Sequence, residues 1–191
     1  MRTIGIILTG GRSTRFGEDK SLYKIDGKPM YQHVYDLVDD SGVTDEIIIS
    51  TNEKLKDEFG AHQVIVDEPS LTDVGPLGGL YAVAKKYPGS RFILVSCDTP
   101  YIPSSWIKRL AGHSEKHSGK SVVTKENSML HPTIALFYDP NLEDKLATHL
   151  NSGGRSIRSF FDRIDVAYLD IIEEGYDYAD FININRKSEL K

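Results

Sequence analysis

The chain has 191 residues, of which 39% are hydrophobic and 27% charged, a balance typical of a globular protein. We expect one domain over residues 1–191, since a domain of this length buries enough surface to need no disulfide or metal staple. The formal net charge of −5 argues against a nucleic-acid-binding protein, and the single cysteine excludes a disulfide framework and a cysteine-based zinc site.

Membrane and export signals are missing from the pattern of apolar residues. The first apolar run, Ile4–Leu8, is too short for a signal-peptide core, and no run approaches the roughly 18 residues that span a bilayer. We therefore expect a cytoplasmic protein with no membrane partner and no nucleic-acid partner.

Short apolar runs rich in β-branched residues alternate with stretches of helical spacing. The runs predict buried strands at Thr3–Thr9, Glu46–Ser50, Gln63–Val66 and Arg91–Ser96. The stretches predict helices at Pro29–Asp39, Pro76–Lys86 and Pro103–His117, with Pro76 and Pro103 suited to the first helical position. Later residues predict two strands and one helix: Thr133–Tyr138, Val166–Ile171 and Asn141–Leu150. This order predicts an α/β fold with a mostly parallel sheet and an antiparallel strand.

The loop after the first predicted strand is glycine-rich and basic, unlike the chain as a whole. It reads TGGRSTRFGEDK over residues 9–20, and four cations fall within thirteen residues: Arg12, Arg15, Lys20 and Lys24. Glycines let a backbone wrap an anion, while Arg supplies forked donors and Lys a point charge. The spacing fits neither a Walker A loop nor the dinucleotide fingerprint. We interpret the loop as a triphosphate cradle; a solvated βα loop is the alternative.

Carboxylates follow two predicted strands, at the sheet edge where open α/β proteins bind ligands. Asp98 follows Arg91–Ser96 and is a candidate Mg²⁺ ligand, because Mg²⁺ takes one or two protein carboxylates plus phosphate oxygens; a helix cap is the alternative. Asp67 follows Gln63–Val66 and is a candidate for the nucleotide or the metal's water shell, or is simply solvated. The Gly75–Gly79 loop opens a helix whose amides suit an anion or a base edge; close packing is the alternative.

Other polar residues have weaker patterns. His131 is a candidate contact for the substrate that accepts the transferred group, or a turn histidine. Cys97 is interpreted as a small buried residue. The Asn151–Arg155 turn offers Arg155, or the nearby Arg158, to an anionic acceptor; a helix C-cap by Gly153 is the alternative.

Together these segments resemble the bacterial molybdenum cofactor guanylyltransferase family over nearly the whole chain. The segments that carry the resemblance are LTGGRSTRFGEDK (8–20), GPLGGL (75–80), CDTPYIP (97–103), HPTIAL (131–136) and FININ (181–185). The combination of HPTIAL with CDTPYIP is the most specific part. The resemblance implies a three-layer, Rossmann-like nucleotidyltransferase (GT-A-like) fold. It also implies a nucleotide-binding N-terminal half and a molybdopterin-binding C-terminal half.

The resemblance carries roles onto individual residues. It implies Asp98 as metal ligand, Lys20 and Arg15 as catalytic cations, and His131, Pro132, Asn183 and Asn185 as acceptor contacts. The implied nucleotide-binding residues are Leu8, Thr9, Gly10, Gly11, Arg12, Lys20, Ser50, Asp67, Gly75, Pro76, Leu77, Gly78 and Asp98. Glu68 stays open as an alternative to Asp67. Thr9 and Gly79 stand where the family usually has Ala, which predicts a minor change in volume.

The implied reaction is attack by the terminal phosphate of molybdopterin (Mo-molybdopterin) on the α-phosphorus of GTP, with Mg²⁺ as cofactor and pyrophosphate as leaving group. Such a nucleophile needs no general base, in agreement with the lack of a Ser/His/Asp constellation. A cytidylyl- or sugar-nucleotide transferase of the same fold and a non-catalytic GTP-binding protein stay open. Implied partners are the enzymes that make molybdopterin, the molybdoenzymes that receive the cofactor, and a small GTP-binding accessory protein.

Overall fold

The computed structural model describes residues 1–10, 19–68 and 74–190. Its centre is a seven-stranded sheet of order β5-β4-β1-β6-β8-β7-β9, in which β8 runs antiparallel to both its neighbours and the remaining pairs are parallel. The strands are β1 (Thr3–Leu8), β4 (Glu46–Thr51), β5 (Val64–Val66), β6 (Arg91–Ser96), β7 (Ser121–Glu126), β8 (Met129–Phe137) and β9 (Val166–Asp170). The predicted mostly parallel sheet with an antiparallel strand is confirmed.

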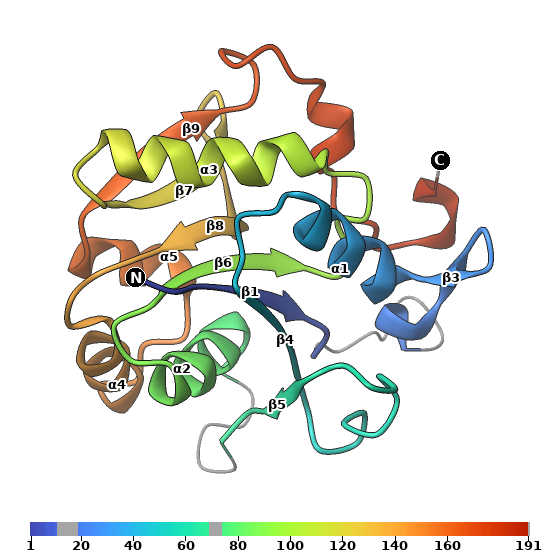
Figure 1. Cartoon of the computed structure of the whole chain (residues 1–191), viewed down its shortest axis with the longest axis horizontal. Coiled ribbons are helices and arrows are strands. Elements are labelled where there is room, and N and C mark those ends of the chain that lie inside the picture. The colour runs from blue at the N-terminus through green and yellow to red at the C-terminus, as the bar shows by residue number, and fades with distance from the viewer. Residues whose placement is uncertain (11–18, 69–73, 191) are drawn as a thin grey trace.

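Helices cover both faces of this sheet and make three layers, as Figure 1 shows. One face carries α1 (Met30–Asp40) and α3 (Ser104–Lys116); the other carries α2 (Pro76–Lys86), α4 (Leu142–Asn151) and the short α5 (Ile157–Phe160). Each face has its own apolar cluster. Strand β1, TIGIIL, is buried over its full length because it lies between both helical layers.

Small elements complete the chain between and after these helices and strands. They are η1 (Lys20–Leu22), the hairpin of β2 (Lys24–Ile25) and β3 (Lys28–Pro29), η3 (Phe161–Arg163), η4 (Tyr178–Phe181) and η5 (Lys187–Glu189). The hairpin turns at Asp26 and Gly27, both with positive φ, as the tight two-residue turn requires. Within the described residues, no helix is long and apolar enough to cross a bilayer.

The structure differs from the sequence-based prediction mainly in the last third. Strand β7 was not predicted, and β8 begins at Met129, four residues before the predicted Thr133. His131 therefore lies in a strand opposite Thr124, so its interpretation as a turn histidine is wrong. Pro103 precedes α3 as its N-cap residue, whereas Pro76 is the first residue of α2, as predicted.

Candidate functional site

The candidate site lies at the carboxyl edge of the parallel strands, where β1, β4 and β6 end side by side. Register pairs Leu8 with Ser50 on one side and with Ser96 on the other. Thr9 and Asn52 directly follow β1 and β4, and Asp98 is the second residue after β6, so the topology brings the three residues to one edge of the sheet.

Asp98 sits in a tight turn directly after β6. The backbone N–H and the hydroxyl of Thr99 both donate to the Ser96 carbonyl, at 3.2 and 2.9 Å, and this fixes the turn. The Asp98 side chain is 12% exposed and does not cap α3, whose N-cap residue Pro103 has no side-chain bond. The helix-cap interpretation of Asp98 is therefore wrong.

Lys20 reaches Asp98 from a segment 78 residues earlier. Its Nζ donates to Asp98 Oδ2 at 2.7 Å, and the lysine side chain is 17% exposed. Asp19 starts the η1 turn by accepting from the Ser21 backbone N–H at 3.0 Å and from its hydroxyl at 2.6 Å. This local cap holds Lys20 at the start of the turn, facing the end of β6.

The C-terminal segment brings a third predicted residue to the same place. Lys20 Nζ donates to Asn185 Oδ1 at 3.2 Å, and the Ile184 N–H donates to the Asp98 carbonyl at 2.7 Å. Glu189 accepts from the backbone N–H groups of Asn185 and Arg186, at 2.6 and 3.0 Å, which anchors the segment. Asn183 precedes this contact in the chain, and its carbonyl accepts from Asn185 Nδ2 at 3.4 Å.

One carboxylate oxygen of Asp98 fits a metal ligand. Oδ1 is buried and has no hydrogen-bond partner in the described ranges, while Oδ2 is bound by Lys20. An unsatisfied buried carboxylate oxygen is costly unless a cation or a donor meets it. No group of three or more His, Cys, Asp or Glu side chains suited to a metal occurs among the described residues. A Mg²⁺ ion bound here would complete its shell with phosphate oxygens and water.

Asp67 has a different environment on the far side of the site. Burial raises the pKa of its carboxyl to about 6, against a smaller lowering by the Ser50 hydroxyl, which lies 3.5 Å from Oδ1. Its neighbour Glu68 instead pairs with Lys85 on the outer surface of α2, at 2.7 Å. Because Glu68 is engaged there, Asp67 is the carboxylate that faces the sheet edge.

Ser50 is the residue on which two departures from the family pattern meet. The Thr9 hydroxyl donates to the Ser50 carbonyl at 3.0 Å. A Cβ added at Gly79 would lie 2.2 Å from Ser50 Oγ and 3.0 Å from Leu8 Cδ2. The difference at Gly79 is therefore more than one of volume, because a side chain there displaces the Ser50 hydroxyl from its place beside Asp67.

The glycine-rich start of α2 packs against the same side chains. Gly75 has φ 64° and ψ −151°, a conformation open to glycine alone, and it precedes Pro76 and the buried Leu77. A Cβ at Gly78 would lie 2.7 Å from Val74 Cγ2 and 3.4 Å from Asp67 Oδ2. Close packing thus accounts for Gly78, and it also brings the N-terminal amides of α2 beside Asp67.

Three predicted site residues lie outside the described residues: Gly11, Arg12 and Arg15. Leu8 and Thr9 are described and buried, and Gly10 is exposed at the end of β1. Gly10 lies next to Thr51 and Asn52, since a Cβ on it would meet their backbones at 3.9 Å.

The acceptor-side candidates lie on the other side of Asp98, along β8. His131 and Pro132 are half-buried near the start of β8, which is the carboxyl edge because β8 runs opposite to β6. Arg155 is occupied at the end of α4, where it donates to the Leu150 and Gly154 carbonyls, both at 2.9 Å. Arg158 donates to the Leu130 carbonyl at 3.1 Å, beside His131. Of the two arginines, Arg158 is therefore the one at this edge.

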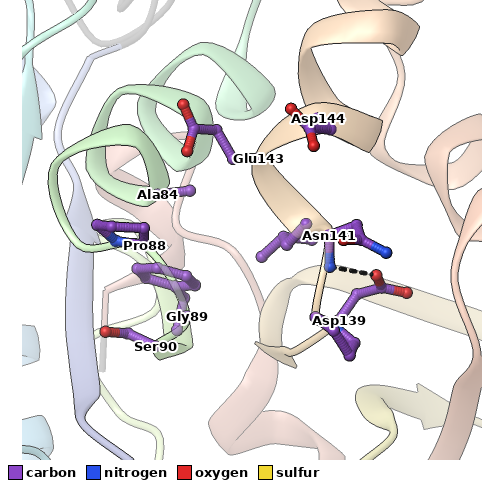
Figure 2. A pocket seen from close by; sticks show the side chains of 11 residues that line it. Ala84, Pro88, Gly89, Ser90, Asp139, Asn141, Glu143 and Asp144 are labelled. Atoms are coloured by element: carbon purple, nitrogen blue, oxygen red, sulfur yellow. Dashed lines mark hydrogen bonds between the residues drawn. The ribbon is translucent and has the colours of Figure 1, made fainter.

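A cavity of about 90 Å³ lies away from this edge, between α2 and α4 (Figure 2). Ala84 and Glu143 line it from the two helices, and Phe92 near the start of β6 also lines it. Figure 2 shows the Asn141 N–H donating to Asp139 Oδ1, at 2.9 Å. Since the cavity borders the amino end of β6, it does not coincide with the candidate site.

Several solved structures have a similar fold, and three of them carry nucleotide-related names. Molybdopterin-guanine dinucleotide biosynthesis protein A from Archaeoglobus fulgidus superimposes with a TM-score of 0.79 at 20% identity, covering 98% of this chain and 94% of that one. A nucleotidyl transferase from Methanothermobacter gives 0.74 at 17%, covering 98% and 94%. A CMP:2-keto-3-deoxy-manno-octonic acid synthetase in complex with CTP gives 0.69 at 15%, covering 89% and 90%.

Identities this low establish the fold alone, which is the three-layer nucleotidyltransferase fold expected from the sequence. The sequence profile of the MobA-like NTP transferase domain matches residues 5–167. This match covers the glycine-rich segment 9–20, Asp67, Asp98 and the HPTIAL segment (131–136). It ends before Asn183 and Asn185. The chain belongs to the MobA-like NTP transferase family.

Proposed function

We propose that this nucleotidyltransferase transfers GMP from GTP to the terminal phosphate of molybdopterin and releases pyrophosphate. The observation that carries the proposal is the contact of Lys20 with both Asp98 and Asn185, three predicted residues brought together from distant parts of the chain. Phosphoryl-group chemistry depends on positioning and on charge stabilisation, and this cluster supplies a cation and a metal-competent carboxylate at one point.

Each side chain has a distinct part in this reaction. When Mg²⁺ is bound, it neutralises phosphate charge and polarises the bond that breaks. Asp98 would hold the metal through Oδ1, and Lys20 would bind the phosphates. Arg12 and Arg15, from the glycine-rich segment 9–20, would share the charge that builds on pyrophosphate. Asn185 orients Lys20 through its amide oxygen. The attacking group is already an oxyanion, so no side chain has to accept its proton.

Asp67 supports guanine as the base. An ionised carboxylate accepts two N–H bonds from the N1 and 2-amino groups of guanine, whereas cytosine offers one amino group on its pairing edge. Asp67 is half-buried beside the N-terminus of α2 and is the carboxylate that faces the sheet edge. A cytidylyltransferase of the same fold is the second candidate, supported by the CTP-bound structural neighbour.

The proposal includes a cytoplasmic setting and the partners that the family resemblance implies. Those partners are the enzymes that supply molybdopterin, the molybdoenzymes that receive the dinucleotide, and a small GTP-binding accessory protein.

The test is pyrophosphate release with GTP, CTP, ATP or UTP, each with and without molybdopterin and Mg²⁺. Release with GTP only, and only when pterin and metal are both present, is the expected result. Release with CTP instead of GTP would show that the protein is a cytidylyltransferase, the second candidate. Tight GTP binding without release under any condition favours the non-catalytic GTP-binding alternative and contradicts the proposal.

A further inference from the structure

The β7–β8 hairpin brings a second carboxylate to the edge that holds Asp98. Register pairs Thr124 with His131 and Glu126 with Met129. Alternate residues of a strand share a face, and directly opposed residues share it too, so Glu126 and His131 lie on the same face of the hairpin. Strand β8 is the neighbour of β6, and adjacent strands are about 4.8 Å apart, so the hairpin end lies one to two strands from Asp98.

His131 carries an unsatisfied nitrogen at this position. Nε2 is buried and has no hydrogen-bond partner in the part of the chain that the structure describes. Glu126 Oε2 lies 3.8 Å from this nitrogen, too far for a hydrogen bond. Burial lowers the pKa of the imidazole despite the opposing effect of Glu126, and this favours the neutral ring. A buried neutral ring with an open nitrogen is suited to a hydrogen bond from a ligand.

The groups around the pair suit a flat, polar ring. Arg158 lies beside His131 through its bond to the Leu130 carbonyl, and its charge also lowers the His131 pKa. Met129, opposite Glu126, is 50% exposed and offers a polarisable apolar surface. These groups match a nitrogen heterocycle. The carboxylate suits N–H donors on one edge of such a ring, the imidazole and the guanidinium suit its carbonyl and ring-nitrogen acceptors, and the thioether suits its flat face.

We propose that Glu126 and His131 bind the pterin ring of the acceptor, with the Glu126 carboxylate accepting from its 2-amino and N3–H groups and His131 bonding a further heteroatom. This inference rests on the proposed function and assigns the acceptor's ring to the β7–β8 hairpin. The 2-amino-4-oxo edge of a pterin is the same donor pair that guanine presents.

The layout of the edge supports a two-ended arrangement. Asp67 follows β5, three strands from β6 on one side, and Glu126 ends β7, two strands from β6 on the other. Asp98 and Lys20 lie between them at the end of β6. The proposed dinucleotide product has a heterocycle at each end and a diphosphate in the middle, which is the same order.

The experiment is a fluorescence titration with 6-hydroxymethylpterin, made while an α,β-methylene analogue of GTP saturates the nucleotide side. We expect saturable binding to the wild type and at least tenfold weaker binding to Glu126→Gln, because an amide replaces part of the acceptor pair with donors. His131→Phe should weaken binding severalfold and serves as the second variant if Glu126→Gln fails to fold. Glu173→Gln, an exposed glutamate just after β9, is the matched control and should bind as the wild type does.

Several results would overturn the inference. One is wild-type affinity in both Glu126→Gln and His131→Phe. Another is absence of saturable binding to the wild type. If the pterin then binds only when the GTP analogue is left out, the ring occupies the Asp67 subsite instead. Failure of the proposed function is detected separately, as absence of pyrophosphate release from GTP and molybdopterin by the wild type. The pterin titration then still decides whether the hairpin binds the ring.

Discussion

Two aspartates at the same sheet edge have contrasting environments. Asp98 is paired with a lysine at 2.7 Å and keeps one oxygen unsatisfied. Asp67 pairs with no cation in the described part of the chain. The Ser50 hydroxyl lies 3.5 Å from its Oδ1, and burial raises the pKa of its carboxyl to about 6. The first arrangement places an ammonium group directly against the carboxylate. In the second arrangement, the ionisation of the carboxyl depends on what binds beside it.

This contrast separates two tasks that nucleotide transfer requires. A carboxylate with a fixed charge suits a metal and the phosphates, because it must balance charge throughout the reaction. A carboxyl with a raised pKa suits a base edge, because N–H donors from the ligand stabilise its ionised form on binding. We therefore propose that Asp98 balances charge and that Asp67 recognises the base.

The largest effect is expected at Asp98. Asp98→Ala removes the proposed metal ligand and leaves Lys20 without its partner, so transfer should fall by about 10³ or more while the protein stays folded. Steady-state pyrophosphate release with Mg²⁺ measures the loss, and circular dichroism melting checks the fold. Turnover at the wild-type rate would contradict the assignment of Asp98.

Lys20→Met separates the lysine's two contacts. We expect kcat to fall by about 10², because a phosphate-binding cation is lost. Without nucleotide, however, Mn²⁺ should bind several times more tightly, because the lysine no longer competes for Asp98. Electron paramagnetic resonance titration with Mn²⁺ measures this, with Asp98→Asn as the control that abolishes the site. Unchanged or weaker Mn²⁺ binding in Lys20→Met would show that the ion pair does not compete with the metal.

A pH dependence should distinguish Asp67 from Asp98. With a pKa of about 6, roughly one tenth of Asp67 is ionised at pH 5 and nearly all at pH 7.5, so GTP affinity should rise about tenfold between these values. The affinity rises with pH because only the ionised carboxylate accepts hydrogen bonds from both N–H groups of the base. Isothermal titration of the wild type against Asp67→Asn isolates this change from titration of the nucleotide's own phosphate. An identical pH profile in the variant would exclude Asp67 from base binding.

The smallest effect is expected at Gly79. Gly79→Ala puts a methyl group in the position of the Ser50 hydroxyl, which must rotate away from Asp67. Because that hydroxyl lowers the Asp67 pKa, its loss should raise the pKa further and weaken GTP binding a few-fold near pH 6.5. The same titration at pH 6.5 and pH 8.5 measures this, with recovery expected at pH 8.5. An equal loss at both values would indicate steric damage instead.

Much of the N-terminal half could be predicted from the sequence because its signals are local. Strand β6 and helix α2 begin and end at the predicted residues, since continuous apolar runs and an N-terminal proline mark such elements strongly. Lys20, Asp98 and Asn185 were each predicted as site residues. Their mutual contacts could not be, because they depend on tertiary packing across 78 and 165 residues.

The C-terminal half was harder because its strands are irregular. A proline normally argues against a strand, so the sequence did not predict the part of β8 that precedes Thr133 and contains Pro132. The register between β7 and β8 shifts at this proline. Val123 pairs with Ala135 and the next residue, Thr124, pairs with His131, so Pro132 has no paired residue on β7. The cross-strand proximity of Glu126 and His131 follows from this register and could not be obtained from spacing alone.

The division of tasks between the two aspartates is tested most directly by base selectivity. The measurement is the ratio of kcat/KM for GTP to that for CTP, with molybdopterin and Mg²⁺, in the wild type and in Asp67→Asn. We predict that the wild type prefers GTP over CTP by a factor of about 10² or more. A paired base contact typically discriminates by about 1–3 kcal/mol, and the other base contacts add to it. In Asp67→Asn we predict that the preference falls to about tenfold or less. An undiminished preference in Asp67→Asn, or a wild-type preference for CTP, would contradict the account.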